Sequence, residues 1–284
     1  MSLLPKLVDA ATLAAHLEDD RLRVIDASVA YLPEHPDPRE VYDREHIPGA
    51  AFADLPGAFS DPDSEHSFTV PAPERFAEAI GALGVGPGTH VVIYTQTWPI
   101  YGTRLWWLLH LHGFDDVSIL DGGLGAWRAA GLPLTDAPPA YPPATFVGRR
   151  RPELLAPLEE VEAIAAADGA GTCLVNALPE AIFRGEQPAT DGRYGRIPGS
   201  VSGPWTNLAD LETGVFRPLD EQRAYLESIG ALGSGRPVVA YCGGGVSATL
   251  VLFSLWLLGV DDARLYDGSL SEWLSDASRP VAVG

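Results

Sequence analysis

The sequence is internally repeated, and this constrains the fold more than any other feature. Five short motifs of the first half return in the second half in the same order, at offsets that fall slowly from 150 to 146 residues. This order indicates a duplicated domain, for which 284 residues provide enough chain. The paired motifs are Ile25–Ala27 with Val175–Ala177, His46–Ala50 with Arg196–Ser200, Gly81–Gly84 with Gly230–Gly233, Val91–Tyr94 with Val238–Tyr241, and Asp121–Gly123 with Asp267–Ser269.

A proline-dense segment separates the two copies. Residues 136–146 read DAPPAYPPATF and contain four prolines. Proline-rich segments favour extended, semi-rigid conformations and resist helix formation. We therefore predict a first domain over residues 1–135, a linker over residues 136–152 and a second domain over residues 153–284.

Short apolar runs alternate with longer helical patterns in each half. The runs predict buried strands over residues 23–27, 91–94 and 117–120, and helices over residues 105–111 and 248–258. This alternation predicts an α/β fold in which each domain is a doubly wound, mainly parallel sheet flanked by helices.

Ligands of such sheets bind beyond the carboxyl ends of the strands, so the loops after Tyr94 and Tyr241 are candidate sites. Asp121 and Asp267 are expected to cap the helices that follow them. Gly259 is expected to follow the end of the second predicted helix.

The chain is strongly acidic. It has 38 acidic and 19 basic residues, a net charge of −19. Such a field repels phosphate backbones and anionic lipids, so we expect neither a nucleic-acid partner nor a membrane partner. An anionic substrate would need a locally positive pocket.

The chain has two cysteines, Cys173 and Cys242. Two are too few for a disulfide framework or a four-cysteine zinc site. All seven histidines precede residue 113, which excludes a local cysteine–histidine metal site at Cys242. Cys173 opens an apolar strand and is predicted to be a buried core thiol. No secretory signal pattern opens the chain, so we expect a cytoplasmic location, where a free cysteine stays reduced.

The loop after Tyr241 has the composition of an anion site. Cys242 is followed by three glycines and then by the predicted buried helix. Glycines let backbone N–H groups converge on one point, and a helix N-terminus adds partial positive charge there. Such a site stabilises a thiolate and makes Cys242 a candidate nucleophile. Ser247 can cap the helix, contact the site, or do both. The matching first-half loop, residues 95–102, has neither a cysteine nor a glycine run.

The chain resembles the tandem-domain rhodanese sulfurtransferases. In this family two homologous α/β domains follow each other, and only the C-terminal one carries the nucleophile, which opens a six-residue loop after a parallel strand. The resemblance covers nearly the whole chain. It rests on the duplication, on His46–Gly49 and Ile197–Gly199, on the run Cys242, Gly243, Gly244, Gly245, Val246, Ser247 and Ala248, and on Asp121–Gly123 and Asp267–Ser269.

The resemblance implies transfer of a sulfane sulfur. Cys242 would take sulfur from thiosulfate or 3-mercaptopyruvate as a persulfide, stabilised by the N–H groups of Gly243 to Ala248. A thiol, a thioredoxin or cyanide would accept the sulfur. No metal or organic cofactor is implied. The uncharged loop is similar to the Cys-Gly-Ser/Thr-Gly-Val-Thr pattern of mercaptopyruvate-preferring members, although Gly244 replaces the loop hydroxyl.

The residues that would bind the donor are less well matched to the family pattern. Ile182 and roughly Ala189 stand where the mercaptopyruvate enzymes have two arginines. The neighbouring candidates for a carboxylate clamp are Arg184, Arg193 and Arg196, because a planar guanidinium binds a carboxylate in bidentate fashion. His66 lies where the family often places a first-domain histidine that faces the cleft.

Three other functions are weighed against this one. Phosphatases and arsenate reductases share the fold but need the pattern Cys-x5-Arg, and Ala248 stands at the arginine position. A non-enzymatic binding module is disfavoured by the intact cysteine and glycine loop. A carrier that delivers persulfide sulfur to a protein partner would use the same chemistry and remains open.

Overall fold

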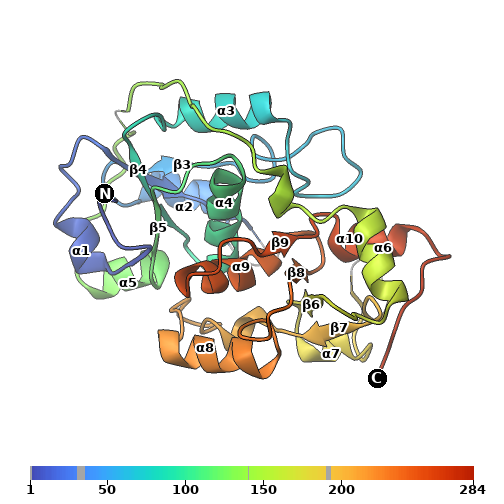
Figure 1. Cartoon of the computed structure of the whole chain (residues 1–284). Coiled ribbons are helices and arrows are strands. Elements are labelled where there is room, and N and C mark those ends of the chain that lie inside the picture. Colours follow the sequence, from blue (N-terminus) through green and yellow to red (C-terminus); the bar gives the residue numbers. More distant parts are fainter. Residues whose placement is uncertain (1, 31–35, 140, 190–192) are drawn as a thin grey trace. The chain divides into compact units, whose positions relative to one another are not determined.

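The computed structural model describes residues 2–30, 36–139, 141–189 and 193–284 (Figure 1). The chain forms two compact units, each with its own parallel sheet flanked by helices, which confirms the predicted fold class. The first unit comprises Met1–Asp63, Val70–Arg150 and Leu211–Phe216. The second comprises Ser64–Thr69, Arg151–Asp210 and Arg217–Gly284. The domain limits at residues 135 and 153 stay a prediction.

The first unit is built around five parallel strands in the order β1-β5-β4-β2-β3. The strands and helices are β1 (Leu7–Val8), α1 (Ala10–Ala14), β2 (Leu22–Asp26), α2 (Pro38–Arg44), β3 (Ala51–Phe52), α3 (Pro73–Ala82), β4 (His90–Tyr94), α4 (Pro99–Leu111), β5 (Val117–Leu120) and α5 (Gly123–Ala129). The strands predicted over residues 23–27, 91–94 and 117–120 correspond to β2, β4 and β5.

Side chains of this sheet alternate between two covered faces, as the pleat of a strand requires. Val24 and Val92 pack with Leu13 of α1 and Trp127 of α5 on one face. The two helices lie together at that face in Figure 1. On the other face α4 covers Ile93. Every residue of α4 is buried, including the polar residues Thr103, Arg104 and His110, and most of its side chains are apolar, as expected for a helix with no solvent-facing stripe.

The second unit repeats this plan with four parallel strands in the order β7-β6-β8-β9. Its elements are the 3-10 helix η1 (Pro152–Leu154), α6 (Leu158–Ala166), β6 (Cys173–Asn176), α7 (Glu180–Phe183), β7 (Ser200–Ser202), the 3-10 helix η3 (Trp205–Asn207), α8 (Leu219–Ser228), β8 (Val238–Tyr241), α9 (Ala248–Leu257), β9 (Arg264–Leu265) and α10 (Ser269–Ser275).

The core of the second unit follows the same alternation. Val239 packs with Val161 of α6 and Trp273 of α10 on one face of the sheet. The helix α9 contacts β8 and β9 and is buried along almost its whole length. It ends at Leu257, and Gly259 follows with a φ of +90°, so both the predicted helix and its glycine terminator are confirmed. Cys173 is buried in β6, as predicted for a core thiol.

A tyrosine ends the central strand in both units, but its neighbour differs. Asp26 lies in register with Tyr94, and Asn176 lies in register with Tyr241. The Tyr241 hydroxyl accepts hydrogen bonds from the Asn176 side-chain amide at 3.0 Å and from the Ile197 backbone N–H at 3.1 Å. Burial raises the pKa of Tyr241 to about 12, so the hydroxyl stays protonated. The amide of Asn176 therefore has a structural partner.

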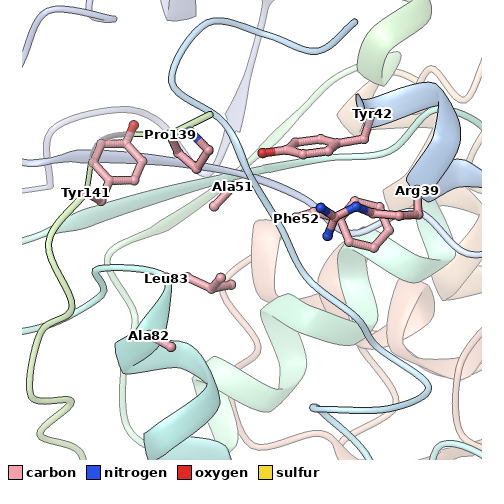
Figure 2. Close-up of a pocket in the computed structure, with 8 residues that line it drawn as sticks. All are labelled: Arg39, Tyr42, Ala51, Phe52, Ala82, Leu83, Pro139 and Tyr141. Atoms are coloured by element: carbon pink, nitrogen blue, oxygen red, sulfur yellow. The ribbon is translucent and has the colours of Figure 1, made fainter. Parts of the chain in front are cut away.

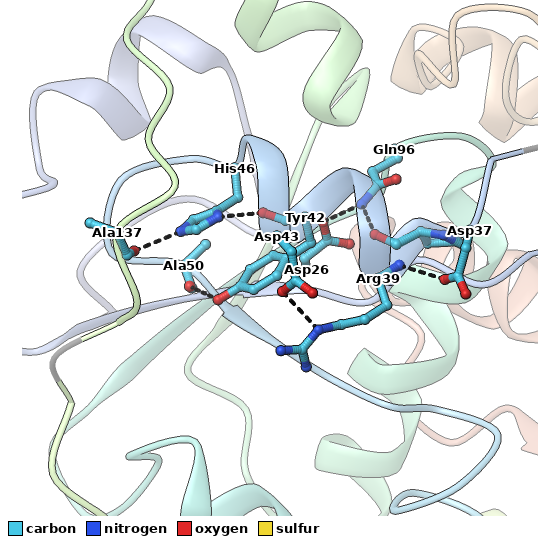
Figure 3. Close-up of polar contacts among 10 residues, drawn as sticks. Asp26, Asp37, Arg39, Tyr42, Asp43, His46, Ala50, Gln96 and Ala137 are labelled. Carbon is cyan, nitrogen blue, oxygen red and sulfur yellow. Dashed lines mark hydrogen bonds and ion pairs between the residues drawn. The ribbon is translucent and has the colours of Figure 1, made fainter.

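Asp26, the first-half counterpart, is a fully buried carboxylate in a polar network (Figure 3). It accepts hydrogen bonds from the Ser28 backbone N–H and hydroxyl, and from the Gln96 side-chain amide at 2.8 Å. Gln96 also donates to the Pro38 carbonyl at 2.9 Å, which connects the loop after β4 to α2. Burial is the dominant effect on this carboxyl group and raises its pKa, while the hydrogen bonds oppose that rise.

The predicted aspartate caps are wrong. Gly122 and Gly268 occupy the positions before α5 and α10, and neither helix has a side-chain cap. Asp121 instead accepts a hydrogen bond from the Phe216 backbone N–H at 2.8 Å. This bond attaches the segment Leu211–Phe216 to the first unit.

The Asp26 network predicts a specific pH dependence of stability. Because the folded-state pKa of Asp26 is raised above 3.8, the folded chain holds this proton more firmly than the unfolded chain. The resulting stabilisation is present below pH 3.8 and is lost as the pH rises through the folded-state pKa. The variant Asp26→Asn, which copies Asn176, should therefore gain stability relative to the parent as the pH rises from about 4 to about 7.

Urea unfolding of both proteins across this pH range measures the effect. The exposed Asp20→Asn variant controls for removal of a surface carboxylate. If the stability difference between Asp26→Asn and the parent does not change with pH, the pKa of Asp26 is not raised in the folded protein and the prediction is wrong.

Candidate functional site

Cys242 stands at the carboxyl end of β8 and is 2% exposed. Its carbonyl accepts a hydrogen bond from the Leu270 N–H at 3.0 Å. Thr95 makes the matching contact in the first unit, where its carbonyl accepts from the Leu124 N–H at 2.9 Å. Thr95 therefore occupies the structural position of Cys242, and the first unit has a threonine in place of the nucleophile.

Ser269 holds the beginning of the cysteine loop in place. Its buried hydroxyl oxygen accepts from the backbone N–H groups of Cys242 at 3.0 Å and Gly245 at 3.1 Å. It donates its proton to the Tyr266 carbonyl at 2.9 Å, and it lies 4.0 Å from the Cys242 sulfur. The Ser269 backbone has a φ of +50°, a left-handed conformation that costs a non-glycine residue about 1–2 kcal/mol.

The Asp267–Ser269 motif is visible in the sequence, but the role of Ser269 is not predicted from it. The first-half counterpart of Ser269 is Gly123, which has a similar φ of +53° without the strain. The signal available in the sequence was the difference between the two copies of this motif, which has serine at position 269 and glycine at the duplicated position 123. The hydroxyl is what the second unit gains at the cost of this strain.

The rest of the loop leaves backbone donors free. Among the described residues, no protein acceptor takes the N–H groups of five loop positions, of which the last three are buried. Such orphan donors are rare in proteins unless a ligand or water binds them. The five are Gly243, Gly244, Val246, Ser247 and Ala248.

The glycines of the loop have different functions. Gly245 has a φ of +73°, where only glycine is free of strain. Gly244 has no such need, since a Cβ there would lie 3.6 Å from the Ser67 carbonyl oxygen and 3.7 Å from the Ser271 hydroxyl. Ser271 holds Gly243 in place, because the N–H and the hydroxyl of Ser271 each donate a hydrogen bond to the Gly243 carbonyl at 2.8 Å.

Ser247 stands directly before α9, but its side chain makes no capping hydrogen bond. The capping role is therefore wrong, and contact with a bound donor stays a prediction. The loop nevertheless feeds directly into the N-terminus of α9, a helix of ten residues. The partial positive charge of that terminus lies next to the free N–H groups.

His66 belongs to a first-half segment that packs with the second unit. Ser64–Thr69 belongs to the second unit, and the Ser67 carbonyl oxygen would lie 3.6 Å from a Cβ placed on Gly244. The segment is held by a 2.7 Å hydrogen bond between the hydroxyls of Ser64 and Thr69. His66 thus lies one residue from a contact with the cysteine loop, and its role in binding stays a prediction.

The three candidate arginines have partners of their own within the second unit. Arg196 donates to the carbonyls of Phe183 and Gly284 and lies over the Phe183 ring. Arg193 donates to the Leu274 carbonyl. Arg184 pairs with Glu180 at 3.0 Å and is half exposed. These contacts do not bring the guanidinium groups to Cys242, so a carboxylate clamp stays a prediction.

Two further properties of the described chain bear on the chemistry. No group of three or more histidine, cysteine, aspartate or glutamate side chains in those residues is arranged to hold a metal ion. No helix there combines the length and apolar character needed to cross a bilayer.

Comparisons with known proteins agree on one family. The model of the rhodanese-like domain matches residues 9–130 and 180–276. The probable 3-mercaptopyruvate sulfurtransferase of Pseudomonas aeruginosa is 38% identical, over 98% of each chain. The 3-mercaptopyruvate sulfurtransferase of Homo sapiens is 36% identical, over 98% of this chain and 94% of the human one. The crystal structure of SseA from Escherichia coli, described as a 3-mercaptopyruvate sulfotransferase, matches with a TM-score of 0.83 at 33% identity, over 94% of this chain and 99% of that one.

The chain therefore belongs to the rhodanese-like family, as its motifs predicted. It is a sulfurtransferase with two rhodanese-like regions, an enzyme that moves a sulfur atom from a donor to an acceptor.

The contacts of Ser269 predict how two of its variants will behave. Ser269→Ala should lower the free energy of unfolding by about 1–3 kcal/mol, because two buried N–H groups lose their acceptor. It should slow sulfur transfer at least about tenfold, because the loop loses its fixed geometry. Ser269→Gly should be about 1 kcal/mol more stable than Ser269→Ala, since the left-handed strain disappears, and equally slow.

Urea unfolding and steady-state sulfur transfer measure the two effects separately. If Ser269→Ala is less stable than the parent but transfers sulfur at the parent rate, the hydroxyl supports the fold and not the reactive loop.

Proposed function

We propose that Cys242 is the nucleophile of this sulfurtransferase and carries the transferred sulfur as a persulfide. The observation that supports this most strongly is the set of five backbone N–H groups, in the loop that begins at Cys242, for which the described residues provide no acceptor. An outer sulfur on Cys242 adds one atom to the side chain and carries negative charge. The free donors and the N-terminus of α9 suit such an anion.

The proposed first half-reaction balances without a cofactor. The Cys242 thiolate attacks the sulfur of 3-mercaptopyruvate, and a bond forms between the two sulfurs. The bond between that sulfur and the donor carbon breaks, and its electron pair leaves as the enolate of pyruvate. The enolate takes the proton that the donor thiol carried, which leaves a Cys242 persulfide anion and pyruvate. In the second half-reaction a thiolate or cyanide attacks the outer sulfur and restores the Cys242 thiolate.

We propose 3-mercaptopyruvate as the preferred donor and thiosulfate as the weaker one. The loop from Cys242 to Ala248 contains no charged side chain, and thiosulfate presents a sulfonate group that a charged loop would bind better. The relatives from Pseudomonas aeruginosa and Homo sapiens carry the name of the mercaptopyruvate enzyme. In this mechanism the donor thiol supplies the proton for pyruvate. A side-chain hydroxyl at position 244, where this chain has glycine, is therefore not needed.

The proposed acceptors are a small thiol, a thioredoxin-like protein or cyanide. A net charge of −19 disfavours a nucleic-acid acceptor. We place the reaction in the cytoplasm, because its reducing conditions keep a free thiol such as Cys242 available.

The two cysteines provide a matched test of the nucleophile. After incubation with 3-mercaptopyruvate, the parent protein should gain about 32 Da on the peptide that contains Cys242, the mass of one sulfur. Cys242→Ser should show no gain and should lose transfer activity by at least about a thousandfold, because a hydroxyl is a much weaker nucleophile. Cys173→Ser should keep both, since burial raises the pKa of the Cys173 thiol and its sulfur faces the Ile229 carbonyl.

A persulfide on Cys173, or activity in Cys242→Ser, would contradict the assignment. A persulfide on Cys242 that small thiols and cyanide discharge only slowly would identify the protein as a sulfur carrier for a specific protein acceptor.

The donor proposal predicts different kinetics for two substrates. The parent enzyme should have a kcat/KM at least about tenfold higher for 3-mercaptopyruvate than for thiosulfate. If Arg184, Arg193 or Arg196 binds the donor carboxylate, its glutamine variant should raise the KM for 3-mercaptopyruvate about tenfold with little change in kcat. Arg236→Gln serves as the control. Equal kcat/KM values for the two donors would overturn the donor preference, and an unchanged KM in all three variants would remove these arginines from the site.

A further inference from the structure

The first unit contains a pocket of about 280 Å³ beside its edge strand β3 (Figure 2). Its walls come from α2, β3, the end of α3 and the segment that follows α5, four stretches that are far apart in the sequence. All lining residues belong to the first unit, whereas Cys242 belongs to the second. The lining residues are Arg39, Tyr42, Ala51, Phe52, Ala82, Leu83, Pro139 and Tyr141.

The aromatic walls of the pocket are held in place by other contacts. Tyr42 donates its hydroxyl proton to the Ala50 carbonyl at 2.6 Å and stacks on His46, with the ring centroids 4.1 Å apart. His46 in turn contacts the carbonyls of Tyr42 and Ala137, as Figure 3 shows. Tyr141 lies under the guanidinium of Arg23, 4.4 Å from its ring centroid. The rings therefore form a preorganised surface for a flat apolar group.

Among the described residues, Arg39 is the only cationic side chain that lines the pocket. Its guanidinium carbon lies 5.5 Å from the ring centroids of both Tyr42 and Phe52. Its Nε pairs with Asp43 at 2.9 Å, and within the described residues its two Nη nitrogens have no protein partner. Figure 2 shows these nitrogens directed into the pocket. A parallel pair of N–H donors is the geometry that binds a carboxylate in bidentate fashion.

We propose that this pocket binds a small aromatic carboxylate, with its ring between Tyr42, Phe52 and Tyr141 and its carboxylate on the Nη nitrogens of Arg39. The volume of about 280 Å³ suits one ring with a short acidic side chain. A cationic ligand would be repelled by Arg39, and a neutral one would gain no charge-assisted hydrogen bond from it. The Asp43 carboxylate holds Nε and so orients the guanidinium toward the ligand.

Phenylacetate is a suitable probe for the full-length protein. Amide spectra of the deuterated, ¹⁵N-labelled chain should show saturable shifts at Phe52 and Leu83, with a submillimolar Kd. Benzyl alcohol lacks the charge and acetate lacks the ring, so each should bind at least about tenfold more weakly. 2-Phenylethylamine, which carries the opposite charge, should not bind. Shifts centred on the loop after Cys242, or equal affinity for phenylacetate and benzyl alcohol, would overturn the proposal.

Three variants separate the roles of charge and shape. Arg39→Gln should weaken phenylacetate binding at least about tenfold, whereas Arg44→Gln, an exposed arginine of the same helix outside the pocket, should leave it unchanged. Ala82→Phe places a ring at an exposed position of the pocket wall and should block binding. All three substitutions lie at exposed positions, so their thermal unfolding should match the parent. Unchanged affinity in both Arg39→Gln and Ala82→Phe would overturn the site.

Discussion

The reactive loop depends on one buried hydroxyl group. The Ser269 hydroxyl oxygen accepts hydrogen bonds from the N–H groups of Cys242 and Gly245. These two bonds fix the residue before the three-glycine run and the last glycine of that run. Within the part of the chain that the structure describes, five other N–H groups of this loop have no protein acceptor, at the point where α9 begins. Donors that are fixed in advance cost no reorganisation when an anion arrives. The left-handed strain at Ser269 is the energetic cost of this arrangement.

The duplication shows how one scaffold supports two different loops. In both units the loop begins at the carboxyl end of the central strand. Its first residue, Thr95 or Cys242, accepts a hydrogen bond through its carbonyl from the equivalent helical N–H group, that of Leu124 or Leu270. In the first unit Thr95 stands in place of Cys242, so the thiol nucleophile is missing. Gly123 stands in place of Ser269, so the hydroxyl that shapes the loop of the second unit is missing too. Gln96, the residue after Thr95, instead donates hydrogen bonds to the buried Asp26 and to the Pro38 carbonyl. The first unit thus keeps the fold and lacks the reactive geometry, and its pocket lies elsewhere, beside β3.

Much of this could be predicted from the sequence because the signals are local. Strands β2, β4 and β5 and helix α9 are continuous apolar segments, and Cys242 follows directly from one of them. Other features depend on contacts between distant segments. The attachment of Ser64–Thr69 to the second unit, the bonds of Ser269 and the partners of Arg193 and Arg196 have no local pattern. The aspartate caps failed because Gly122 and Gly268 follow the aspartates and take the capping positions.

The N–H groups of the Cys242 loop that the described residues leave without an acceptor are proposed as the binding site of the transferred sulfur. A crystal structure of the protein after treatment with 3-mercaptopyruvate, without an acceptor, tests it most directly. We expect an outer sulfur on Cys242 within hydrogen-bonding distance of at least three of the N–H groups of Gly243, Gly244, Val246, Ser247 and Ala248, with Ser269 still bound to the Cys242 N–H. An outer sulfur that points away from the loop, with water on these N–H groups, would contradict it.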